Sequence, residues 1–436
     1  MKRRDLLLGA GALSLTACTG LAREASRPAT IEEAFLYAFP LYEFTRTALG
    51  RAAAPGLNRI AHRASLADHT SRAITAPNND TVYSSAQLEL SGGPVEVISP
   101  SDRTRYFNIS FMDAFTDNFA AIGTGPTGGE GGRYWIAGPD WRGEAPAGVK
   151  VLRASTHDVW MLGRILVEGP EDLAAAAALQ RQITIRPVMD AAPRPYEVKA
   201  TRAEDADNFL AVVNAALARS PARAGHMVRA GLFGAFGLGP GLTPSAAQSA
   251  LWRSYMPEGL ERLRDGFRQR DRVVAGWGYQ EPGVGEAAAS DRLRSATALG
   301  GLAALPEAEA MYFQASEDVT GAPLSGERGY VWRVPPGGVP AKAFWSLTMY
   351  QAEADGRFFL VENPIRRFSV GDRTPGLRPN ADGSIDIYLQ ADRPEGDKAA
   401  NWLPSPAGPM RLSLRAYLPE DVLRARRWRV PGIERI

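Results

Sequence analysis

The sequence predicts a β-rich α+β protein in which two antiparallel β domains flank a helical region. Short strand patterns, separated by Gly, Pro and Asp turns, run over 82–167 and return over 330–418. Such spacing is typical of antiparallel sandwiches or barrels. The 44 Gly and 32 Pro also favour turn-rich β structure. A chain of 436 residues exceeds the usual size of one compact core, so we expect two or more domains.

The charge balance gives no support for a nucleic-acid partner. The formal net charge is +2, but Lys2–Asp5 contributes three basic residues and one acidic residue from a removable leader. The rest of the chain carries 47 basic and 47 acidic side chains. A near-neutral protein of this kind is expected to bind neither nucleic acid nor an anionic membrane surface by charge.

Residues 1–17 have the layout of a bacterial export signal, in which a short basic region precedes a Leu/Gly/Ala run too short to span a membrane. Arg3-Arg4 resembles the twin-arginine export motif. Leu15–Cys18 resembles a lipobox, in which Cys18 is acylated and becomes the new N-terminus. We therefore expect a lipoprotein on the periplasmic or cell-envelope side, anchored through Cys18 and a tether over 18–29. An ordinary signal peptide with an incidental cysteine is the alternative.

Several common classes of site are disfavoured. Cys18 is the only cysteine, which excludes an intramolecular disulfide and a cysteine-rich metal site. His62 and His69 lie in a polar loop and are expected to be solvated. The glycines within 231–241 follow a helical pattern without a surrounding βαβ unit, so no nucleotide cofactor is expected. G-x-S-x-G and H-E-x-x-H motifs are absent, which disfavours a serine triad or a zinc enzyme.

The N-terminal domain, expected over 30–190, begins with a helix. Thr30 and Glu33 form a capping box at its start. The apolar positions of the helix run over Ile31–Ala48, and Pro40 should kink or divide it.

A polar segment, Asn78, Asn79 and Asp80, precedes a strand over Val82–Leu90. These three residues have the chemistry of a good turn. They also suit the oxygen-rich rim of a ligand site or of a Ca²⁺ or Mg²⁺ site. The sequence alone does not decide between a turn and the rim of a site.

The stretch Arg105–Gly123 carries the strongest candidates for catalysis. Apolar residues alternate over 107–111, Asp113 falls on their side of the strand, and Asp117 follows four residues later. Two such carboxylates can perform acid–base work if one pKa is raised, with Asp80 as a third candidate and Arg105 or Arg164 as charge partners. The same oxygens could hold Ca²⁺ or Mg²⁺. The structural alternative is that each aspartate secures a turn by accepting backbone hydrogen bonds.

The remaining elements follow from period and turn residues. Further N-terminal strands are expected at Val95–Ile98, Arg133–Ile136, Val151–Arg153 and Val159–Val167. Helices are expected at Glu171–Gln182, Asp205–Arg219, Met227–Phe236, Ser245–Tyr255, Pro257–Arg270 and Asp291–Ala310. C-terminal strands are expected at Tyr330–Val334, Phe344–Tyr350, Phe358–Val361, Ile385–Leu389 and Arg411–Leu418.

Two sets of sequence blocks are characteristic of a known family. The first comprises 77–83, the Arg105 stretch through 119, 137–141 and 159–164, and the second comprises 343–350, 363–364, 382–384, 401–404 and 414–419. On these blocks the chain resembles the bacterial exported proteins that pair two domains of unknown function, numbered 1254 on the N-terminal side and 1214 on the C-terminal side. The resemblance covers nearly all of the chain after the leader.

The resemblance implies a finer fold but no reaction. It implies an immunoglobulin-like N-terminal β-sandwich, a helical connector over 191–310 and a lectin-like or jelly-roll C-terminal β-sandwich over 311–436. One departure is Arg366-Arg367-Phe368, where relatives tend to have Asn-Arg-Tyr. The lost amide and hydroxyl put a polar role of this segment in doubt.

The C-terminal domain supplies aromatic and polar candidates for ligand binding. Sandwich domains often bind sugars with an aromatic platform and convergent polar side chains. Residues of the right chemistry are Trp345, Tyr350, Asn363, Arg367, Asn401 and Trp402. The alternative is that the aromatic residues belong to the core, as is common in sandwiches.

These observations predict an anchored envelope protein that binds a small or oligomeric polar ligand such as a carbohydrate. A carboxylate-based hydrolase or lyase acting on a glycan is the first alternative, and a structural or assembly protein of the envelope is the second. The membrane is reached through the lipid anchor only. Homo-oligomerisation is left open.

Overall fold

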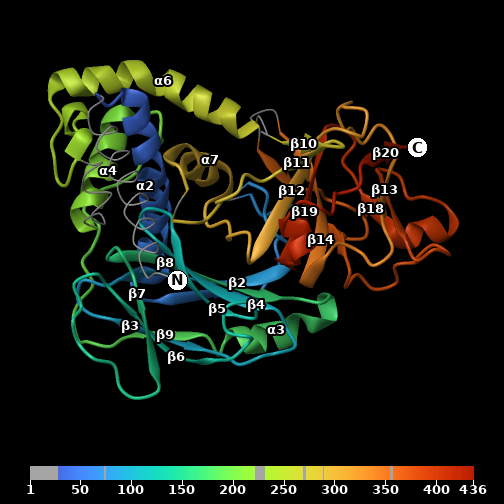
Figure 1. Cartoon of the computed structure of the whole chain (residues 1–436), viewed down its shortest axis with the longest axis horizontal. Helices are drawn as coiled ribbons and strands as arrows, with labels where there is room; N and C mark the ends of the chain where they lie inside the picture. The colour runs from blue at the N-terminus through green and yellow to red at the C-terminus, as the bar shows by residue number, and fades with distance from the viewer. Residues whose placement is uncertain (1–27, 73–74, 221–230, 269–271, 288, 354–356) are drawn as a thin grey trace, which may run out of the picture.

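The computed structural model describes residues 28–72, 75–220, 231–268, 272–287, 289–353 and 357–436. In these ranges the strands form four sheets, two from the first half of the chain and two from the second half. Helices pack beside the N-terminal sheets, and the C-terminal sheets lie at the opposite end of the molecule (Figure 1). The β-rich fold class is thereby confirmed. The predicted leader, Cys18 and the start of the helix expected at Met227 lie outside the described residues.

The N-terminal sheets share one apolar core. The first sheet is antiparallel, in the order β1 (Ile60–Arg63), β2 (Thr81–Glu89), β8 (Asp158–Leu166), β4 (Phe107–Asp113) and β5 (Asn118–Gly123). The second is mixed, in the order β7 (Val149–Arg153), β6 (Gly132–Ala137), β3 (Val95–Ser99) and β9 (Thr184–Pro187). Helix α3 (Leu173–Gln180), preceded by η2 (Pro170–Asp172), contributes to the same core.

The three central strands of the first sheet, β2, β8 and β4, are buried on both faces, and one of these faces carries many polar side chains. The alternation predicted over 107–111 is confirmed, since Phe107, Ile109 and Phe111 face the shared core. On the other face, Tyr83, Arg164 and Asn108 stand in one row across β2, β8 and β4. Two rows further along, Gln87 pairs with Trp160. We call the face of the sheet that carries these two rows the polar ladder.

Helix α2 (Ile31–Arg51) lies against β2 on this side of the sheet and packs with α4 (Ala206–Arg219), α6 (Ala246–Arg268) and α7 (Asp291–Gly301). Helix α6 lies on the far side of this helical layer from the sheet (Figure 1). The capping box of Thr30 and Glu33 is present as predicted. Helix α2 continues across Pro40, and α6 continues across Pro257 where two helices were expected. Pro40 is buried among the helices, so tertiary packing offsets the hydrogen bond that proline cannot donate. No helix among the described residues has the length and apolarity needed to cross a membrane.

The C-terminal sheets also share a core. One contains β10 (Val273–Val274), β11 (Trp277–Tyr279), β12 (Ala310–Ala315), β19 (Met410–Pro419), β14 (Ala341–Ala352), β15 (Phe358–Leu360) and β16 (Ser369–Gly371). The other contains β18 (Trp402–Pro404), β17 (Ile385–Gln390), β13 (Tyr330–Val334) and β20 (Ile433–Arg435). Short helices are η1 (Ala52–Gly56), η3 (Gly234–Phe236), η4 (Gly396–Asn401) and α8 (Asp421–Arg424).

One predicted helix was too long. The helix expected over Asp291–Ala310 ends at Gly301, and Ala310 begins strand β12. Gly300 and Gly301 are the last two residues of the helix, and Pro306 follows a few residues later; both residue types end helices. Glu309 therefore lies immediately before a strand, and not within a helix as the sequence predicted.

Candidate functional site

Asp113 lies at the end of β4 and is fully buried. Its Oδ1 accepts hydrogen bonds from the backbone amides of Phe115 and Asp117, each at 3.0 Å. Its Oδ2 accepts one from the Ser155 hydroxyl. Thr116, between these amides, has a φ of 67°, which marks a tight turn. These contacts are those of an aspartate that secures the β4–β5 turn.

Asp117 faces helix α7. Its Oδ1 pairs with Nη2 of Arg294 at 2.8 Å, and both side chains are buried. Arg294 also donates to the carbonyls of Phe115 and Ala287, each at 2.7 Å. The ion pair therefore joins the turn to α7, which supports the structural alternative for Asp117 as well.

Arg105 lies at the opposite end of β4 from Asp113. Its guanidinium makes a two-pronged contact with Asp172, with Nη2 and Oδ1 2.6 Å apart, and donates to the Leu166 carbonyl at 2.7 Å. Asp172 ends the short helix η2. Arg105 thus anchors the segment before α3 and is not brought to the predicted carboxylates.

Two C-terminal candidates form a local hydrogen-bonded turn. Asn363 donates through Nδ2 to the carbonyls of Val361 and Arg367 at 3.0 Å and accepts the Arg367 amide at 2.9 Å. Arg367 donates through Nη1 to the carbonyls of Ala400 and Trp402, each at 2.9 Å. Both side chains therefore connect loops of the C-terminal domain.

Three more candidates of the C-terminal domain also make their contacts within that domain. Asn401 exchanges two hydrogen bonds of 2.8 Å with the backbone of Arg378. Trp402 is buried, and its indole donates to the Gln390 carbonyl at 2.8 Å. Trp345 lies in the core that the two sheets share, as the alternative proposed.

The remaining candidates meet where the two halves of the chain face each other. We name this group the junction cluster. Asn78, Asp80, Arg164 and Tyr350 were predicted, and the structure adds residues that the sequence did not single out. Its members are Asn78, Asp80, Tyr83, Tyr106, Asn108, Arg164, Glu309, Tyr312, Tyr350, Arg415 and Tyr417.

The Asn78–Asp80 segment reaches across to the C-terminal sheet. Asn78 donates through Nδ2 to the Tyr417 hydroxyl at 2.7 Å. Asp80 is 5% exposed and accepts the hydroxyl of Ser346 at 2.5 Å. Nη2 of Arg373 lies 3.9 Å from Asp80 Oδ1. By contrast, Asn79 turns back within its own domain to donate to the Ala67 carbonyl.

Arg415 forms the C-terminal half of the cluster. It is buried on β19, where Nη1 donates to Thr348 Oγ1 at 2.9 Å and Nη2 to the Tyr350 hydroxyl at 2.8 Å. Nη2 also contacts the Ala76 carbonyl at 3.2 Å, across the domain boundary. Burial by itself lowers the pKa of Arg415. Tyr350 and the other acidic neighbours, including Asp80, outweigh this effect, so that the pKa is raised.

Arg164 forms the N-terminal half. It is buried in the polar ladder, donates through Nη1 to Ser110 Oγ at 3.2 Å and through Nη2 to the Ala303 carbonyl at 2.8 Å. Its Cζ lies 5.8 Å from the centre of the Tyr83 ring. Asn108 stands on its other side in the same row and is fully buried. A cation, a phenol and an amide are therefore presented side by side.

Glu309 faces this row from the start of β12. Its Oε1 accepts the Tyr106 hydroxyl at 2.7 Å. Burial raises the pKa of Glu309, while Tyr106, Asn108 and Arg164 oppose the rise. The side-chain amide of Asn108 is near Glu309, although it makes no hydrogen bond of good geometry within the described ranges. A Cβ at position 125 would lie 2.6 Å from Glu309 Oε2, so the backbone of Gly125 closes this side.

Aromatic rings hold the two halves of the cluster together. Tyr106 packs at 5.2 Å from Tyr417, and Tyr417 stacks on Phe344 with 4.1 Å between ring centres. Burial raises the pKa of Tyr106 and Tyr417 well above the usual range of a phenol. Both phenols therefore stay neutral and can donate hydrogen bonds at physiological pH.

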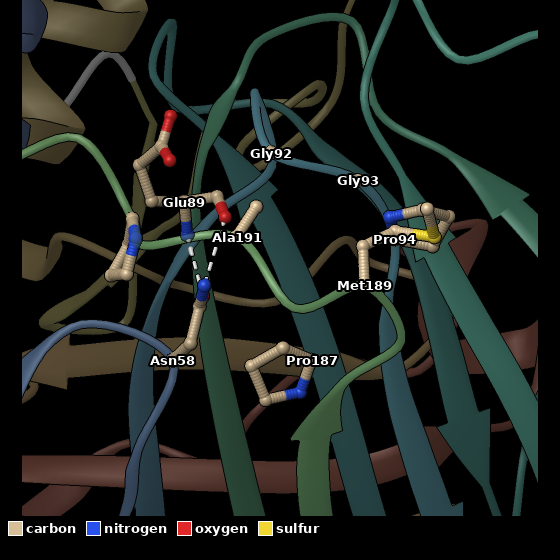
Figure 2. Close-up of a pocket in the computed structure, with 9 residues that line it drawn as sticks. Asn58, Glu89, Gly92, Gly93, Pro94, Pro187, Met189 and Ala191 are labelled. Atoms are coloured by element: carbon tan, nitrogen blue, oxygen red, sulfur yellow. Dashed lines mark hydrogen bonds between the residues drawn. The ribbon is translucent and has the colours of Figure 1, made fainter.

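Within the described residues, no three His, Cys, Asp or Glu side chains gather to hold a metal. A small cavity of about 10 Å³ lies beside Asn58 and Glu89, at the end of β2 (Figure 2). Asn58 donates to the Glu89 carbonyl at 3.0 Å and accepts its amide at 2.8 Å. A space of this volume suits at most one water molecule. A cavity of about 130 Å³ lies between α2, α6 and α7, with Phe35, Tyr255 and Leu263 on its walls.

Two family models match the chain: Protein of unknown function (DUF1254) over residues 57–187 and the corresponding family DUF1214 over 309–421. The crystal structure of the VPA0106 protein from Vibrio parahaemolyticus has a TM-score of 0.72 and 25% identity, and the match covers 93% of this chain and 98% of that one. An uncharacterised protein from Burkholderia cenocepacia has a TM-score of 0.47 and 15% identity, covering 98% and 96%. No curated protein matches the chain.

The two matched regions contribute opposite sides of the junction cluster. Tyr83, Tyr106 and Arg164 fall in the first, and Glu309 and Arg415 fall in the second. Their order along the chain is the order expected from the sequence blocks. The chain belongs to the family of proteins in which a DUF1254 domain is followed by a DUF1214 domain.

Proposed function

We propose that the chain is an exported, lipid-anchored envelope protein that binds a small polar ligand, such as a carbohydrate, at the junction cluster. The observation that carries this proposal is the row of Tyr83, Arg164 and Asn108 facing Glu309. Buried polar groups are costly unless each is paired. A dense buried group of this kind, at a boundary between domains, is where small-molecule sites commonly occur.

The chemistry of the cluster suits a ligand with many hydroxyl groups. Arg164, Arg415 and the neutral phenols supply donors, while Asp80 and Glu309 supply acceptors. A sugar hydroxyl both donates and accepts, so it needs both kinds of partner. Tyr417 and Tyr106 also offer aromatic faces on which a sugar ring can stack. We propose that Asp113 and Asp117 support this site by fixing the turn beside it.

Entry of a ligand requires the two halves of the cluster to separate. The contacts across the boundary include polar ones, such as Asn78 with Tyr417, Asp80 with Ser346 and Arg415 with the Ala76 carbonyl. Polar interfaces between domains resemble transient protein–protein interfaces and permit relative motion. We infer that the ligand binds an opened form and takes over hydrogen bonds that the closed form makes internally. On this view the N-terminal sheets form an immunoglobulin-like sandwich and the C-terminal sheets a jelly roll, which move as units.

A thermal-shift screen tests the proposal. The panel is glucose, galactose, N-acetylglucosamine, glucuronate and galacturonate, with and without Ca²⁺ or Mg²⁺. We expect at least one sugar to raise the Tm by several degrees, because a ligand at 100 times its Kd stabilises by about 2.7 kcal/mol. Tyr106→Phe should reduce this response, whereas Tyr134→Phe should not, since the buried Tyr134 hydroxyl has no hydrogen-bond partner among the described residues. An equal response in both variants would count against the site.

A specific observation favours the hydrolase or lyase alternative at the same place. Burial raises the pKa of Glu309, which suits a general acid, and Asp80 supplies a second buried carboxylate. This assignment places acid–base chemistry at the junction cluster. Release of reducing sugar from oligosaccharides by the wild type, with loss in Glu309→Gln, would support it.

A further inference from the structure

A second group of side chains, of which Gln87 is buried and Arg51 and Trp160 are partly buried, lies further along the polar ladder. Arg51 ends helix α2 and lies over Trp160, with Cζ 4.0 Å from the ring centre. Its Nη2 donates to Gln87 Oε1 at 2.9 Å. Gln87 and Trp160 are neighbours in one row of the sheet, two rows from the row of Arg164. The group is therefore distinct from the junction cluster.

Two donors in this group have no acceptor. Arg51 Nε and Gln87 Nε2 are both buried without a hydrogen-bond partner among the described residues. Gln87 is 0% exposed, so bulk water does not reach its amide. Because Arg51 and Gln87 are hydrogen-bonded to each other, their unpartnered N–H groups lie close together.

Arg51 also has no carboxylate partner among the described ion pairs. Asp158, in the next row, is held by Arg219 through bonds of 2.9 and 2.8 Å. Glu89 accepts the backbone amides of Ser91 and Arg194 at 3.2 and 3.0 Å. Burial lowers the pKa of Arg51 to about 9, the effect expected when a cation is desolvated without a counter-ion.

We propose that Arg51 and Gln87 bind a small inorganic anion of the chloride type. Two N–H donors and one positive charge are the elements that such an anion requires. A water molecule would satisfy the donors but would leave the charge uncompensated. A halide needs no donor or directional acceptor of its own. The anion would fix the end of α2 against strands β2 and β8, as a structural ion.

Two measurements on the full chain test this inference. Thermal unfolding is compared in sodium chloride and sodium gluconate at equal ionic strength, and crystals are soaked in bromide. We expect a higher Tm in chloride and an anomalous bromide peak between Arg51 Nε and Gln87 Nε2. Equal Tm values in the two salts, or an ordered water only at this place, would overturn the proposal.

Three variants separate anion binding from a general role in folding. Gln87→Glu supplies a carboxylate in place of the amide, so its Tm should no longer depend on chloride, while remaining at least that of the wild type. Arg51→Met should weaken bromide binding about tenfold or more, since a hydrogen bond to a charged group is lost. Arg46→Met removes a more exposed arginine of α2 that pairs with Glu43, and should keep the wild-type chloride response. A chloride response retained in Gln87→Glu would contradict the assignment.

Discussion

At the residue scale, the number of hydrogen-bond donors distinguishes carboxylates that hold the fold from a carboxylate available for chemistry. Asp113 has three donors on its two oxygens, and its burial leaves no room for solvent. Glu309 is almost as buried but has one hydroxyl donor, an amide beside it and a raised pKa. Glu309 is therefore the better candidate for a functional carboxylate.

The structural role of Asp113 predicts a large loss of stability on truncation. Asp113→Ala leaves two backbone amides buried without an acceptor, so we expect a loss of about 3 kcal/mol in the free energy of unfolding. Urea denaturation measures this. The exposed Asp392 provides the control, since Asp392→Ala should change stability by less than about 0.5 kcal/mol. A loss under about 1 kcal/mol for Asp113→Ala would reopen a catalytic role.

The raised pKa of Glu309 predicts a pH-dependent difference between the wild type and Glu309→Gln. The folded state holds the proton more tightly than the unfolded state, whose carboxyl titrates near 4.5. The stability that protonated Glu309 contributes is therefore fully present below pH 4.5, and it is lost as the pH rises through 4.5 toward the folded pKa. Gln does not titrate, so the variant should gain stability relative to the wild type across this window.

Chemical denaturation at a series of pH values measures the difference. Glu434→Gln, at an exposed carboxyl, serves as the control and should follow the wild type. A constant offset between wild type and Glu309→Gln at all pH values would show that the pKa of Glu309 is not raised.

Residue chemistry was predictable only where partners are near in sequence. The alternation over 107–111 and the turn chemistry of Asn78–Asp80 followed from local pattern. The contact of Tyr106 with Glu309 joins residues 203 apart, and that of Asp80 with Ser346 joins residues 266 apart. Such pairs depend on tertiary packing, which no local period reports.

At the scale of elements, caps were predicted better than breaks. The capping box of Thr30 and Glu33 is formed as expected, with Thr30 Oγ1 accepting the Glu33 amide at 3.2 Å. Pro40 was expected to kink or divide its helix, and two helices were expected around Pro257, but neither proline divides its helix. Burial of α2 in the helical core outweighs the local cost of proline.

The cap predicts a modest and specific effect. Thr30→Ala removes the hydroxyl acceptor and should cost about 1 kcal/mol. Thr30→Ser keeps the acceptor and should be nearly neutral. Hydrogen exchange of the first turn of α2, together with urea denaturation, measures both. Equal stability of Thr30→Ala and Thr30→Ser would show that the cap contributes little.

At the scale of the molecule, the boundary between the two family domains is a buried polar network. Asn78, Asp80 and Arg415 connect the domains through polar contacts, and Tyr106, Phe344 and Tyr417 add an aromatic core. The order of β and helical regions was predictable from the sequence. The meeting of β2, β8 and β4 with β12, β14 and β19 was not, because it depends on how separate domains pack.

The most direct test of ligand binding at the junction cluster is to locate where a ligand acts on the chain. Hydrogen exchange is measured with and without each panel sugar at millimolar concentration, and peptides covering Asn78–Tyr83 and Met410–Pro419 are compared with the rest. If the ligand binds at the junction cluster, at least one sugar should slow exchange in both segments together, and Tyr106→Phe should weaken the effect. No protection of either segment by any sugar, or protection confined to regions outside the junction cluster, would contradict it.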